Sequence, residues 1–318
     1  MKQYSRVCIV NNVYVLFQYF LLSSLNEINN TYFFFTEDIK EDVVSRFEHT
    51  KLCLPSGKVR QFFFIVWLKF FSDYRWPFLK SCEFWGQDNL LVTSPLIKNR
   101  KIILPEDGLL NYTFRPRKRH FKRLRGFLFG NLQSECPLGY SRNVEHMYLT
   151  GAKEIPEGLK QKAQIVDYSH IWKTSSIEKK NYISEIFGMS SDVAEVFKGN
   201  PKVLFTQPLS EDKILSEDEK VNIYKKIVES VGDELIIKTH PREITNYREI
   251  FPRNVVFDKP IPLELLSLVG IQFSEVYTLF SSSVLNLPTC TKVHWLGYYG
   301  SESLKERYGD SIDCPLPI

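Results

Sequence analysis

The sequence lacks the residue patterns that hold structural metals or staple small secreted domains. Its six cysteines are scattered along 318 residues without Cys-x-x-Cys or Cys-x-x-His spacing, which argues against a zinc site and a disulfide scaffold and fits a reducing compartment. It also lacks Gly/Ser linkers, an acidic tail and internal repeats. Residues 13–25 are apolar but too short to span a bilayer, and no small-x-small cleavage site follows them. We therefore expect a cytoplasmic protein whose membrane contact is at most peripheral, at the inner face of the cytoplasmic membrane.

The chain also has little net charge. A formal charge of +4 is too small to indicate binding of nucleic acid, so no nucleic-acid partner is expected. One stretch is locally basic. It could hold anionic lipid headgroups, a phosphate-bearing substrate or nucleic acid, or it could be an ordinary solvated loop and helix face. Its members are Arg115, Arg117, Lys118, Arg119, His120, Lys122, Arg123 and Arg125.

What the sequence does contain is an alternation of strands and helices. Apolar runs such as Tyr32-Phe33-Phe34-Phe35 are typical of strands buried on both faces. Strands are expected at residues 7–10, 32–35, 51–54, 90–93 and 101–104, with helices at 13–25 and 62–71, the latter buried. The pattern then restarts, with strands at 202–206, 235–238, 255–257, 275–280 and 292–295 and helices at 217–231, 263–269, 283–287 and 301–308.

Strands that alternate with helices imply parallel sheets with right-handed crossovers. We therefore predict an α/β protein of two Rossmann-like domains facing a central cleft, the architecture called GT-B. The boundaries predicted are residues 1–160, residues 161–300, and a tail at 301–318 that packs back on the first domain. Ligands of such sheets bind beyond the carboxyl ends of the strands.

A carboxylate pair follows one of these strand ends. Glu106-Asp107-Gly108 comes directly after the strand at 101–104, and Gly108 permits a tight turn that projects Asp107 outward. Asp107 could act as the general base that deprotonates an attacking hydroxyl. An ordinary acidic turn would have the same sequence.

A histidine follows another strand end, in Lys238-Thr239-His240-Pro241. Pro241 keeps His240 extended and suits the first position of a following helix. As an imidazolium, His240 could bind or protonate a leaving phosphate. The alternative is that His240 simply caps the helix.

The second half of the sequence offers further candidate site residues, three serines and one glutamate. Ser281, Ser282 and Ser283 lie between a strand and a short helix, where free N–H groups and the helix dipole favour phosphate, although one serine would suffice as a cap. Glu264 lies in the first turn of another helix and could accept hydrogen bonds from ribose, or only match the dipole. Because His240, Glu264 and Ser282 all lie at strand ends of one domain, they can converge.

With these motifs the sequence resembles the bacterial GT-B sialyltransferases. Those families share an acidic-acidic-Gly motif, a His-Pro motif and a serine or threonine pair, matched here by Glu106-Asp107-Gly108, His240-Pro241 and Ser282-Ser283. The context Lys238-Thr239-His240-Pro241-Arg242-Glu243 and the strand end Thr206-Gln207-Pro208-Leu209 are most similar to glycosyltransferase family 52. That family holds lipooligosaccharide and capsular sialyltransferases. The likeness covers roughly residues 1–300.

The resemblance implies inverting, metal-independent transfer from CMP-sialic acid to a terminal galactose of a capsular or lipid-linked oligosaccharide, commonly with an α2,3 linkage. Asp107 would be the base, His240 would bind or protonate the leaving phosphate, and Ser282 and Ser283 would hold it. Glu264 would contact the ribose and Pro241 would shape the base pocket. The sequence contains no Asp-x-Asp, in keeping with metal independence, and no cofactor is expected.

Other interpretations stay open. The base could instead be Asp212, after the strand at 202–206, or Asp218, in the capped start of a helix, or Asp88, in a turn. The enzyme could be another GT-B glycosyltransferase or a phosphotransferase with a different nucleotide donor. A non-catalytic protein that binds membranes or polyanions through the basic stretch is the alternative outside enzymes. The oligomeric state is open.

Overall fold

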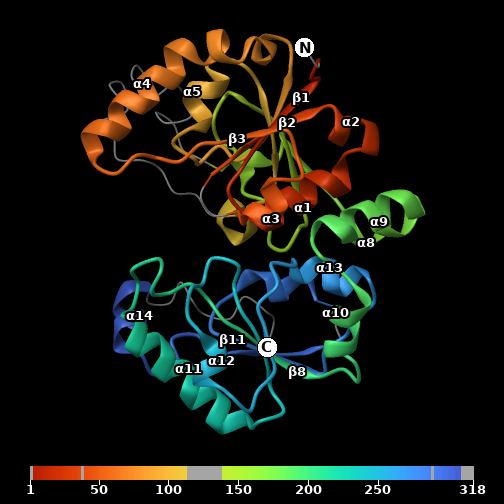
Figure 1. Ribbon diagram of the computed structural model, residues 1–318, viewed down its shortest axis with the longest axis vertical. Helices are drawn as coiled ribbons and strands as arrows, with labels where there is room; N and C mark the ends of the chain where they lie inside the picture. The colour runs from red at the N-terminus through yellow and green to blue at the C-terminus, as the bar shows by residue number, and fades with distance from the viewer. Residues whose placement is uncertain (1–2, 37–38, 113–137, 288–289, 309–318) are drawn as a thin grey trace. The chain divides into compact units, whose positions relative to one another are not determined.

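The computed structural model describes residues 3–36, 39–112, 138–287 and 290–308 of the chain. The chain divides into two compact units, Met1–Ile183 and Ser184–Ile318. Each unit is built on one parallel sheet with helices beside it (Figure 1). The α/β architecture of two Rossmann-like domains is thereby confirmed.

The first unit contains a seven-stranded sheet in the order β3-β2-β1-β4-β5-β6-β7. Every neighbouring pair is parallel. Sequence order reverses between β1 and β4, which makes their carboxyl ends a topological switch point, the usual place for a ligand. The strands are β1 Arg6–Val10, β2 Thr31–Phe35, β3 His49–Lys51, β4 Glu83–Gly86, β5 Ile102–Pro105, β6 Val144–Leu149 and β7 Ala163–Ile165.

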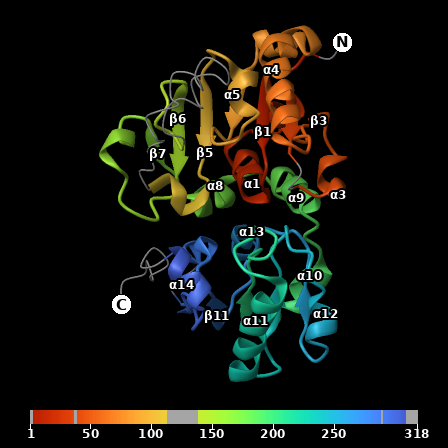
Figure 2. The same cartoon turned by 90° about the vertical axis from the view of Figure 1, so that its left-hand side faces the viewer.

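Helices lie on both faces of this sheet, with α4 and α5 on one side and α1 on the other (Figures 1 and 2). Helix α1 starts where Asn12 accepts the N–H of Val15, a side-chain cap for the free donors of a helix start. The described helices are α1 Val13–Leu22, α2 Leu25–Asn29, α3 Glu41–Val44, α4 Lys58–Arg75, α5 Thr93–Ile97, α8 Tyr168–Thr174 and α9 Ile177–Ile186, with 3-10 turns η1 Pro77–Lys80, η2 Gly108–Tyr112 and η4 Glu157–Leu159.

The second unit contains a five-stranded parallel sheet in the order β10-β9-β8-β11-β12. Here the order reverses between β8 and β11. The strands are β8 Lys202–Phe205, β9 Ile236–Lys238, β10 Val256–Phe257, β11 Glu275–Thr278 and β12 Lys292–Trp295. The helices are α10 Ser191–Val196, α11 Glu217–Val231, α12 Tyr247–Ile250, α13 Leu263–Leu268 and α14 Glu302–Tyr308, with the 3-10 turn η5 Ser282–Asn286.

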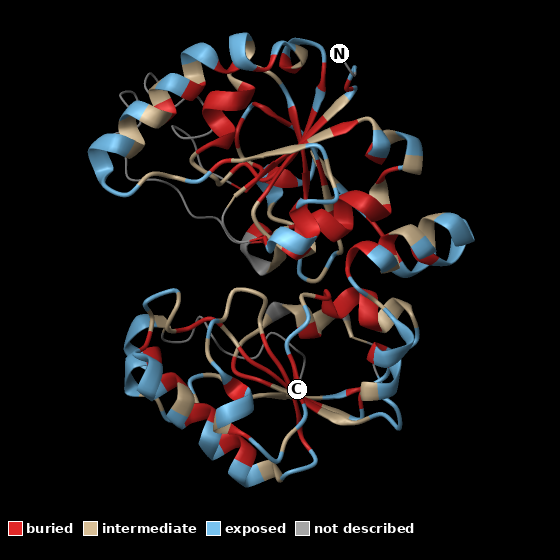
Figure 3. Cartoon of the chain, viewed as in Figure 1, coloured by how far each residue is buried: buried red, intermediate tan, exposed pale blue. Residues whose placement is uncertain are grey.

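The aromatic runs form the core, as the sequence predicts. Phe33, Phe34 and Phe35 of β2 are fully buried, and Figure 3 shows buried residues along the strands of both units. Burial of such side chains contributes roughly 1.5–3 kcal/mol each relative to leaving them exposed. The buried side chains therefore fix the strands in position. The polar residues that directly follow the strand ends are fixed with them.

Some expected elements are wrong. Residues 90–93 are not a strand, because residues 90–92 turn and Thr93 begins α5, where its hydroxyl donates to the carbonyl of Gln87 at 2.6 Å. The strand lies earlier, at β4. The apolar segment 62–71 is helical, as part of α4, but it is not buried: Phe63, Phe70 and Phe71 are exposed, because a helix beside a sheet buries only one face.

The packing of the C-terminal tail and the boundary of the first unit differ from expectation. The tail was expected against the first domain, but its described part, α14, packs on the second unit, where Leu304 is fully buried in the hydrophobic core. Strand β7 belongs to the first sheet, so the first unit extends past residue 160. None of the helices within the described residues has the length and apolar composition needed to cross a membrane.

Candidate functional site

In the first unit, polar side chains meet at the carboxyl ends of three neighbouring strands. Asn12 follows β1, Gln87 and Asn89 follow β4, and Asp107 follows β5. The Asp107 carboxylate accepts three hydrogen bonds: Oδ1 from Asn12 Nδ2 at 2.9 Å, and Oδ2 from Gln87 Nε2 at 3.0 Å and Asn89 Nδ2 at 2.9 Å. The predicted base therefore lies at the switch point of the first sheet.

The partners of Asp107 are all neutral amides. They fix the direction of the carboxylate without neutralising its charge, and the side chain keeps access to solvent because it is only half-buried. Gly108 supports this geometry with a φ of 69°, which favours glycine, and the Asp107 N–H donates to Asn111 Oδ1 at 2.5 Å. A carboxylate held in this way can accept a proton from a hydroxyl placed against it.

Glu106, the neighbour of Asp107, has a structural position. It is buried, and its Oε2 accepts from the Tyr112 hydroxyl at 2.6 Å and the Thr150 N–H at 2.7 Å. Its backbone N–H and carbonyl bond the side chain of Gln18 at 2.9 and 2.7 Å. Glu106 therefore ties the end of β5 to the end of β6 and to α1, and it holds Asp107 in place.

Asp88 is buried as well. Its two oxygens accept the N–H groups of Leu138 and Gly139 at 2.8 and 2.9 Å. Burial, with a smaller contribution from the nearby negative charge of Asp107, raises the pKa of Asp88 to about 6. Asp88 thus anchors a backbone segment beside Asp107, and neither of its oxygens faces solvent.

In the second unit, polar residues gather at the ends of β8, β9 and β11, which are neighbours in the sheet. Gln207 follows β8, His240 follows β9 and Ser281 follows β11. Gln207 Oε1 accepts the N–H of Phe280 at 3.0 Å, a bond that joins the two strand ends at the switch point. Gln207 belongs to the strand end Thr206-Gln207-Pro208-Leu209 on which the family resemblance partly rests, but no role was predicted for its side chain.

His240 is held in a closed turn. Its backbone N–H donates to Glu243 Oε2 at 2.8 Å, and the Glu243 N–H donates back to the His240 carbonyl at 3.0 Å. The expected helix after Pro241 is absent, because the Ile244 N–H, which a helix would direct to the His240 carbonyl, donates to Glu211 Oε1 at 2.9 Å instead. Helix α12 begins only at Tyr247.

The His240 ring is neutral at physiological pH. Burial, together with the positive charges of Arg242 and Lys238, lowers the pKa of His240 to about 3. Nδ1 accepts the N–H of Arg242 at 3.2 Å, so the ring proton is on Nε2. The ring of His240 can thus donate one hydrogen bond through Nε2.

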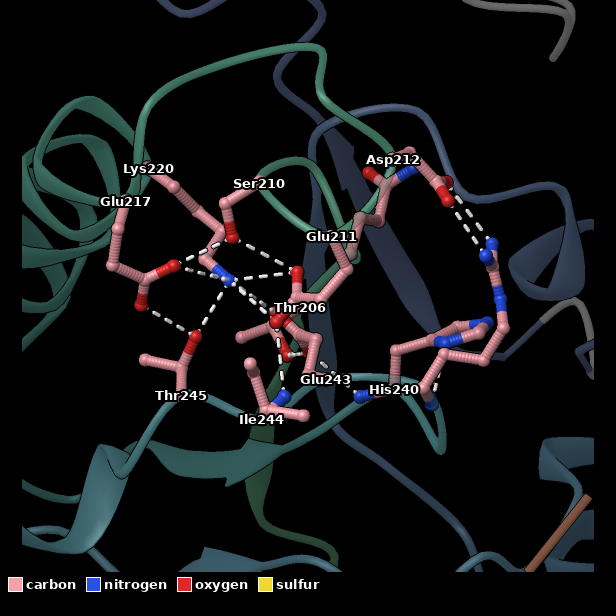
Figure 4. A network of polar contacts seen from close by, with 12 residues as sticks. Thr206, Ser210, Glu211, Asp212, Glu217, Lys220, His240, Glu243, Ile244 and Thr245 are labelled. Carbon is pink, nitrogen blue, oxygen red and sulfur yellow. Dashed lines mark hydrogen bonds and ion pairs between the residues drawn. The ribbon is translucent and has the colours of Figure 1, made fainter. Parts of the chain in front are cut away.

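A buried ion network supports this turn (Figure 4). Lys220 of α11 is fully buried, and its ammonium contacts Glu211 at 2.9 Å, Glu217 at 3.2 Å and Glu243 at 3.7 Å. Glu243 also accepts from the hydroxyls of Thr206 and Tyr247, and burial raises its pKa. The network joins β8, α11 and the turn that carries His240.

This network was not predicted from the sequence. Lys220 lies on the buried face of α11 with Ile223, Tyr224 and Ile227. A lysine at that helical spacing from apolar residues was the available signal, because a buried lysine needs anionic partners.

Asp212, the rival base, is joined to the same turn. Arg242 forms a two-point ion pair with it, Nη1 to Oδ1 at 2.6 Å and Nη2 to Oδ2 at 3.0 Å. Asp212 is exposed and linked to His240 through Arg242 (Figure 4). Asp218 is exposed in the first turn of α11, beside the capping box of Ser216 and Glu219, where it matches the helix dipole.

The serines and Glu264 lie on adjacent segments. The hydroxyls of Ser281 and Ser283 bond each other at 2.8 Å, and the Ser281 side chain makes no capping bond to η5. The short helix expected here is a 3-10 turn. Glu264 is buried in the first turn of α13, which contacts η5. The Ser282 side chain is not described.

Two further expectations concern the basic stretch and a possible metal site. The basic stretch with Arg115, Arg117, Lys118 and Arg119 lies outside the described residues. Over the described ranges, no group of three or more His, Cys, Asp or Glu side chains is arranged to hold a metal ion.

Comparisons with known proteins connect this geometry to a family. Residues 23–296 match glycosyltransferase family 52. An uncharacterized protein of Haemophilus influenzae is 32% identical over 310 residues, which cover 96% of this chain and 98% of that protein.

Two solved structures share the fold. The α/β-galactoside α2,3-sialyltransferase of the luminous marine bacterium Photobacterium phosphoreum aligns with a TM-score of 0.56 at 13% identity, over 92% of this chain and 90% of its own. The GT-B domain of a sialyltransferase from Photobacterium damselae aligns with a TM-score of 0.52 at 13% identity, over 90% of this chain and 89% of its own. The predicted GT-B fold is confirmed.

Proposed function

The chain belongs to glycosyltransferase family 52, and from that premise we propose that it transfers sialic acid from CMP-sialic acid to a terminal galactose, with inversion and an α2,3 linkage. The family makes it a glycosyltransferase. The proposed donor and acceptor are supported by the motifs of the sequence and by the fold it shares with bacterial sialyltransferases.

The observation that carries the proposal is the position of His240. It lies at the end of β9, next to the switch point of the second sheet, in a turn fixed by Glu243. In our proposal Nε2–H donates to the phosphate of the bound CMP group, and Ser281, Ser282 and Ser283, after β11, hold other phosphate oxygens. Glu264 receives the ribose hydroxyls and Pro241 shapes the pocket of the base.

The bond changes of the proposed reaction are simple. The acceptor hydroxyl oxygen bonds to the anomeric carbon while the bond from that carbon to the phosphate oxygen breaks, and the electron pair leaves with CMP. The hydroxyl proton passes to a carboxylate. We propose Asp107 as this base because neutral amides direct it at a strand end, whereas both oxygens of Asp212 face Arg242.

A bound phosphate would change the protonation state of His240. The phosphodiester of the bound donor carries one negative charge, and the leaving CMP gains a second as the bond to the anomeric carbon breaks. Both charges favour the protonated form of the ring, so the affinity of His240 for a proton rises as the leaving group forms. Hydrogen bonds from His240 and the serines then stabilise the developing charge of CMP, which is the role we propose in place of a metal ion.

The acceptor we propose is a capsular or lipid-linked oligosaccharide, and the site of action is the cytoplasmic face of the membrane. The basic residues Arg115, Arg117, Lys118 and Arg119 are proposed to hold the enzyme near anionic lipid. Charge reversal at Arg115, Arg117 and Arg119 should then weaken membrane association and spare activity on a soluble acceptor. Equal loss of both would contradict this role.

A survey of nucleotides by thermal shift tests the proposed donor. CMP and CDP should raise the melting temperature, and UDP and GDP should not, because stabilisation follows from selective binding to the folded state. Stabilisation only by uridine or guanosine nucleotides would favour another GT-B transferase or a phosphotransferase. Binding to liposomes without any nucleotide effect would favour a non-catalytic membrane protein.

A further inference from the structure

Helix α4 carries a stripe of exposed apolar side chains, which we call the α4 stripe. Its members are Val59, Phe63, Trp67, Phe70, Phe71 and Tyr74. At 100° per residue they fall within an arc of roughly 120°, along a helix of about 27 Å. Figure 3 shows exposed residues recurring along α4.

The α4 stripe is not an ordinary scatter of surface side chains. Of the eleven exposed large hydrophobic residues found over the described ranges, six are on this one helix, and Phe63, Phe70 and Tyr74 are 65%, 66% and 88% exposed. Single exposed apolar residues are normal, but an apolar patch of this kind marks a binding surface. The opposite face, with Ile65, Leu68 and Ser72, is buried in the first unit.

The charges around the stripe favour an anionic occupant. Lys58 and Arg60 are exposed at one end of α4 and Arg75 at the other, with Lys69 between them beside the ring of Phe70. The acidic residue of the helix, Asp73, is half-buried and paired with Lys98 at 2.7 Å and Arg100 at 2.9 Å. The outer face of α4 therefore combines aromatic rings with positive charge.

This combination fits a lipid surface better than a second copy of the chain. If two copies met through α4, antiparallel helices would place the Lys58 and Arg60 end against Arg75, and parallel helices would place each basic end against itself. Both arrangements oppose like charges. Aromatic residues prefer the headgroup region of a bilayer, and lysine and arginine bind anionic headgroups.

We propose that α4 is a membrane-docking helix that lies in the plane of an anionic bilayer with the α4 stripe among the headgroups. Docking through α4 is separate from the nucleotide site and does not depend on the reaction.

Vesicle co-sedimentation of the full chain tests this. The protein should pellet with vesicles of phosphatidylcholine and phosphatidylglycerol, and much less with phosphatidylcholine alone. The double variant Phe63→Gln/Phe70→Gln should reduce the partition coefficient at least tenfold. Ile165→Gln/Ile177→Gln is the matched control, because it removes two exposed apolar side chains of the same unit and should bind as the wild type does.

A second variant separates charge from apolar contact. Arg60→Glu/Arg75→Glu keeps the stripe and should abolish the preference for anionic vesicles. Failure of the wild type to pellet, or unchanged pelleting of Phe63→Gln/Phe70→Gln, would overturn the proposal. So would concentration-dependent dimerisation that the double variant abolishes in the absence of lipid binding, which would assign the stripe to a second copy.

Discussion

His240 depends on its immediate surroundings for its chemical state. The backbone is fixed by Glu243, Nδ1 receives the Arg242 N–H, and burial together with the charges of Arg242 and Lys238 disfavours a proton on the ring. A neutral ring with Nε2–H can bind a phosphate oxygen without a prior ion pair. The residue is thus suited to respond to a ligand that brings negative charge.

The first prediction concerns stability and pH. Because the folded pKa of His240 is about 3 and an unfolded histidine titrates near 6.5, the unfolded chain takes up the proton first as the pH falls. Stability linked to His240 is therefore complete above pH 6.5 and is lost toward pH 3, by on the order of 1–2 kcal/mol between pH 7 and pH 5. His240→Asn should lose less stability over that range than the wild type does.

Denaturant unfolding at pH 7 and pH 5, following the second unit, measures this difference. Parallel loss of stability in the wild type and in His240→Asn would show that His240 is not held neutral by the fold.

The second prediction identifies the base. Asp107→Asn keeps the shape of the side chain and should lower kcat by about 10²–10⁴-fold, with little change in CMP affinity, because the proposed nucleotide site is in the other unit. Asp212→Asn should affect CMP affinity more than kcat, through Arg242 and the His240 turn. If instead Asp212→Asn abolishes turnover while Asp107→Asn is nearly normal, the base belongs to the second unit.

At the scale of elements, the site of the first unit depends on close approach of β1 and β4. Gly86 has a φ of 128°, and a Cβ there would lie 1.9 Å from the carbonyl oxygen of Ile9. Directly beyond Gly86, the Gln87 N–H donates to the Ile9 carbonyl at 3.0 Å. The two strands can place Gln87 beside Asp107 only with glycine at position 86.

The third prediction follows from that contact. Gly86→Ala should destabilise the first unit by about 3 kcal/mol or more, because backbone atoms cannot move aside as a flexible side chain can. Gly232→Ala is the matched control. Gly232 has a φ of 108° and a ψ of 175°, but a Cβ there meets no atom within 4 Å, so the substitution carries the conformational cost of about 1–3 kcal/mol without a clash. Equal melting-temperature losses would contradict the steric argument.

The elements also show what the sequence could predict. Helix α11 and strand β12 match the predicted bounds. For α11 the reason is local, because the capping box of Ser216 and Glu219 defines where the helix begins. Strand β6 was missed because polar residues interrupt it, and β7 because it has three residues. The exposed face of α4 could not be distinguished from a buried one, since both are apolar and only packing decides between them.

In the candidate site, too, local sequence predicts some features and tertiary packing decides the others. Asp107 and His240 could be singled out because each directly follows a strand. Their partners could not, because Asn12 lies 95 residues from Asp107 and Lys220 meets Glu211, Glu217 and Glu243 only in the folded chain. The roles of Asp107, Asp212 and the serines remain predictions.

At the scale of the whole molecule, both units follow one plan. Each has a parallel sheet whose order reverses once, and each places its polar residues at the strand ends beside that reversal. The first unit presents a carboxylate held by amides, and the second presents a neutral histidine, serines and a buried ion network. The groups of the first unit suit deprotonation of a hydroxyl, and those of the second suit stabilisation of a phosphate.

The fourth prediction is that transfer needs no metal ion. Because His240 and the serines are proposed to stabilise the leaving phosphate, the rate of transfer should be unchanged by EDTA at millimolar concentration. Added Mg²⁺ or Mn²⁺ should not raise it. Loss of activity in EDTA that excess Mg²⁺ restores would contradict this part of the mechanism.

The most direct test of the central claim is incubation of the protein with CMP-sialic acid and lactose, followed by linkage analysis of the product. The account predicts sialyllactose with an α2,3 linkage, formed at a rate that His240→Ala lowers at least a hundredfold while the melting temperature changes little. Absence of any sialylated product from the folded wild-type protein, together with transfer from another nucleotide sugar, would contradict it.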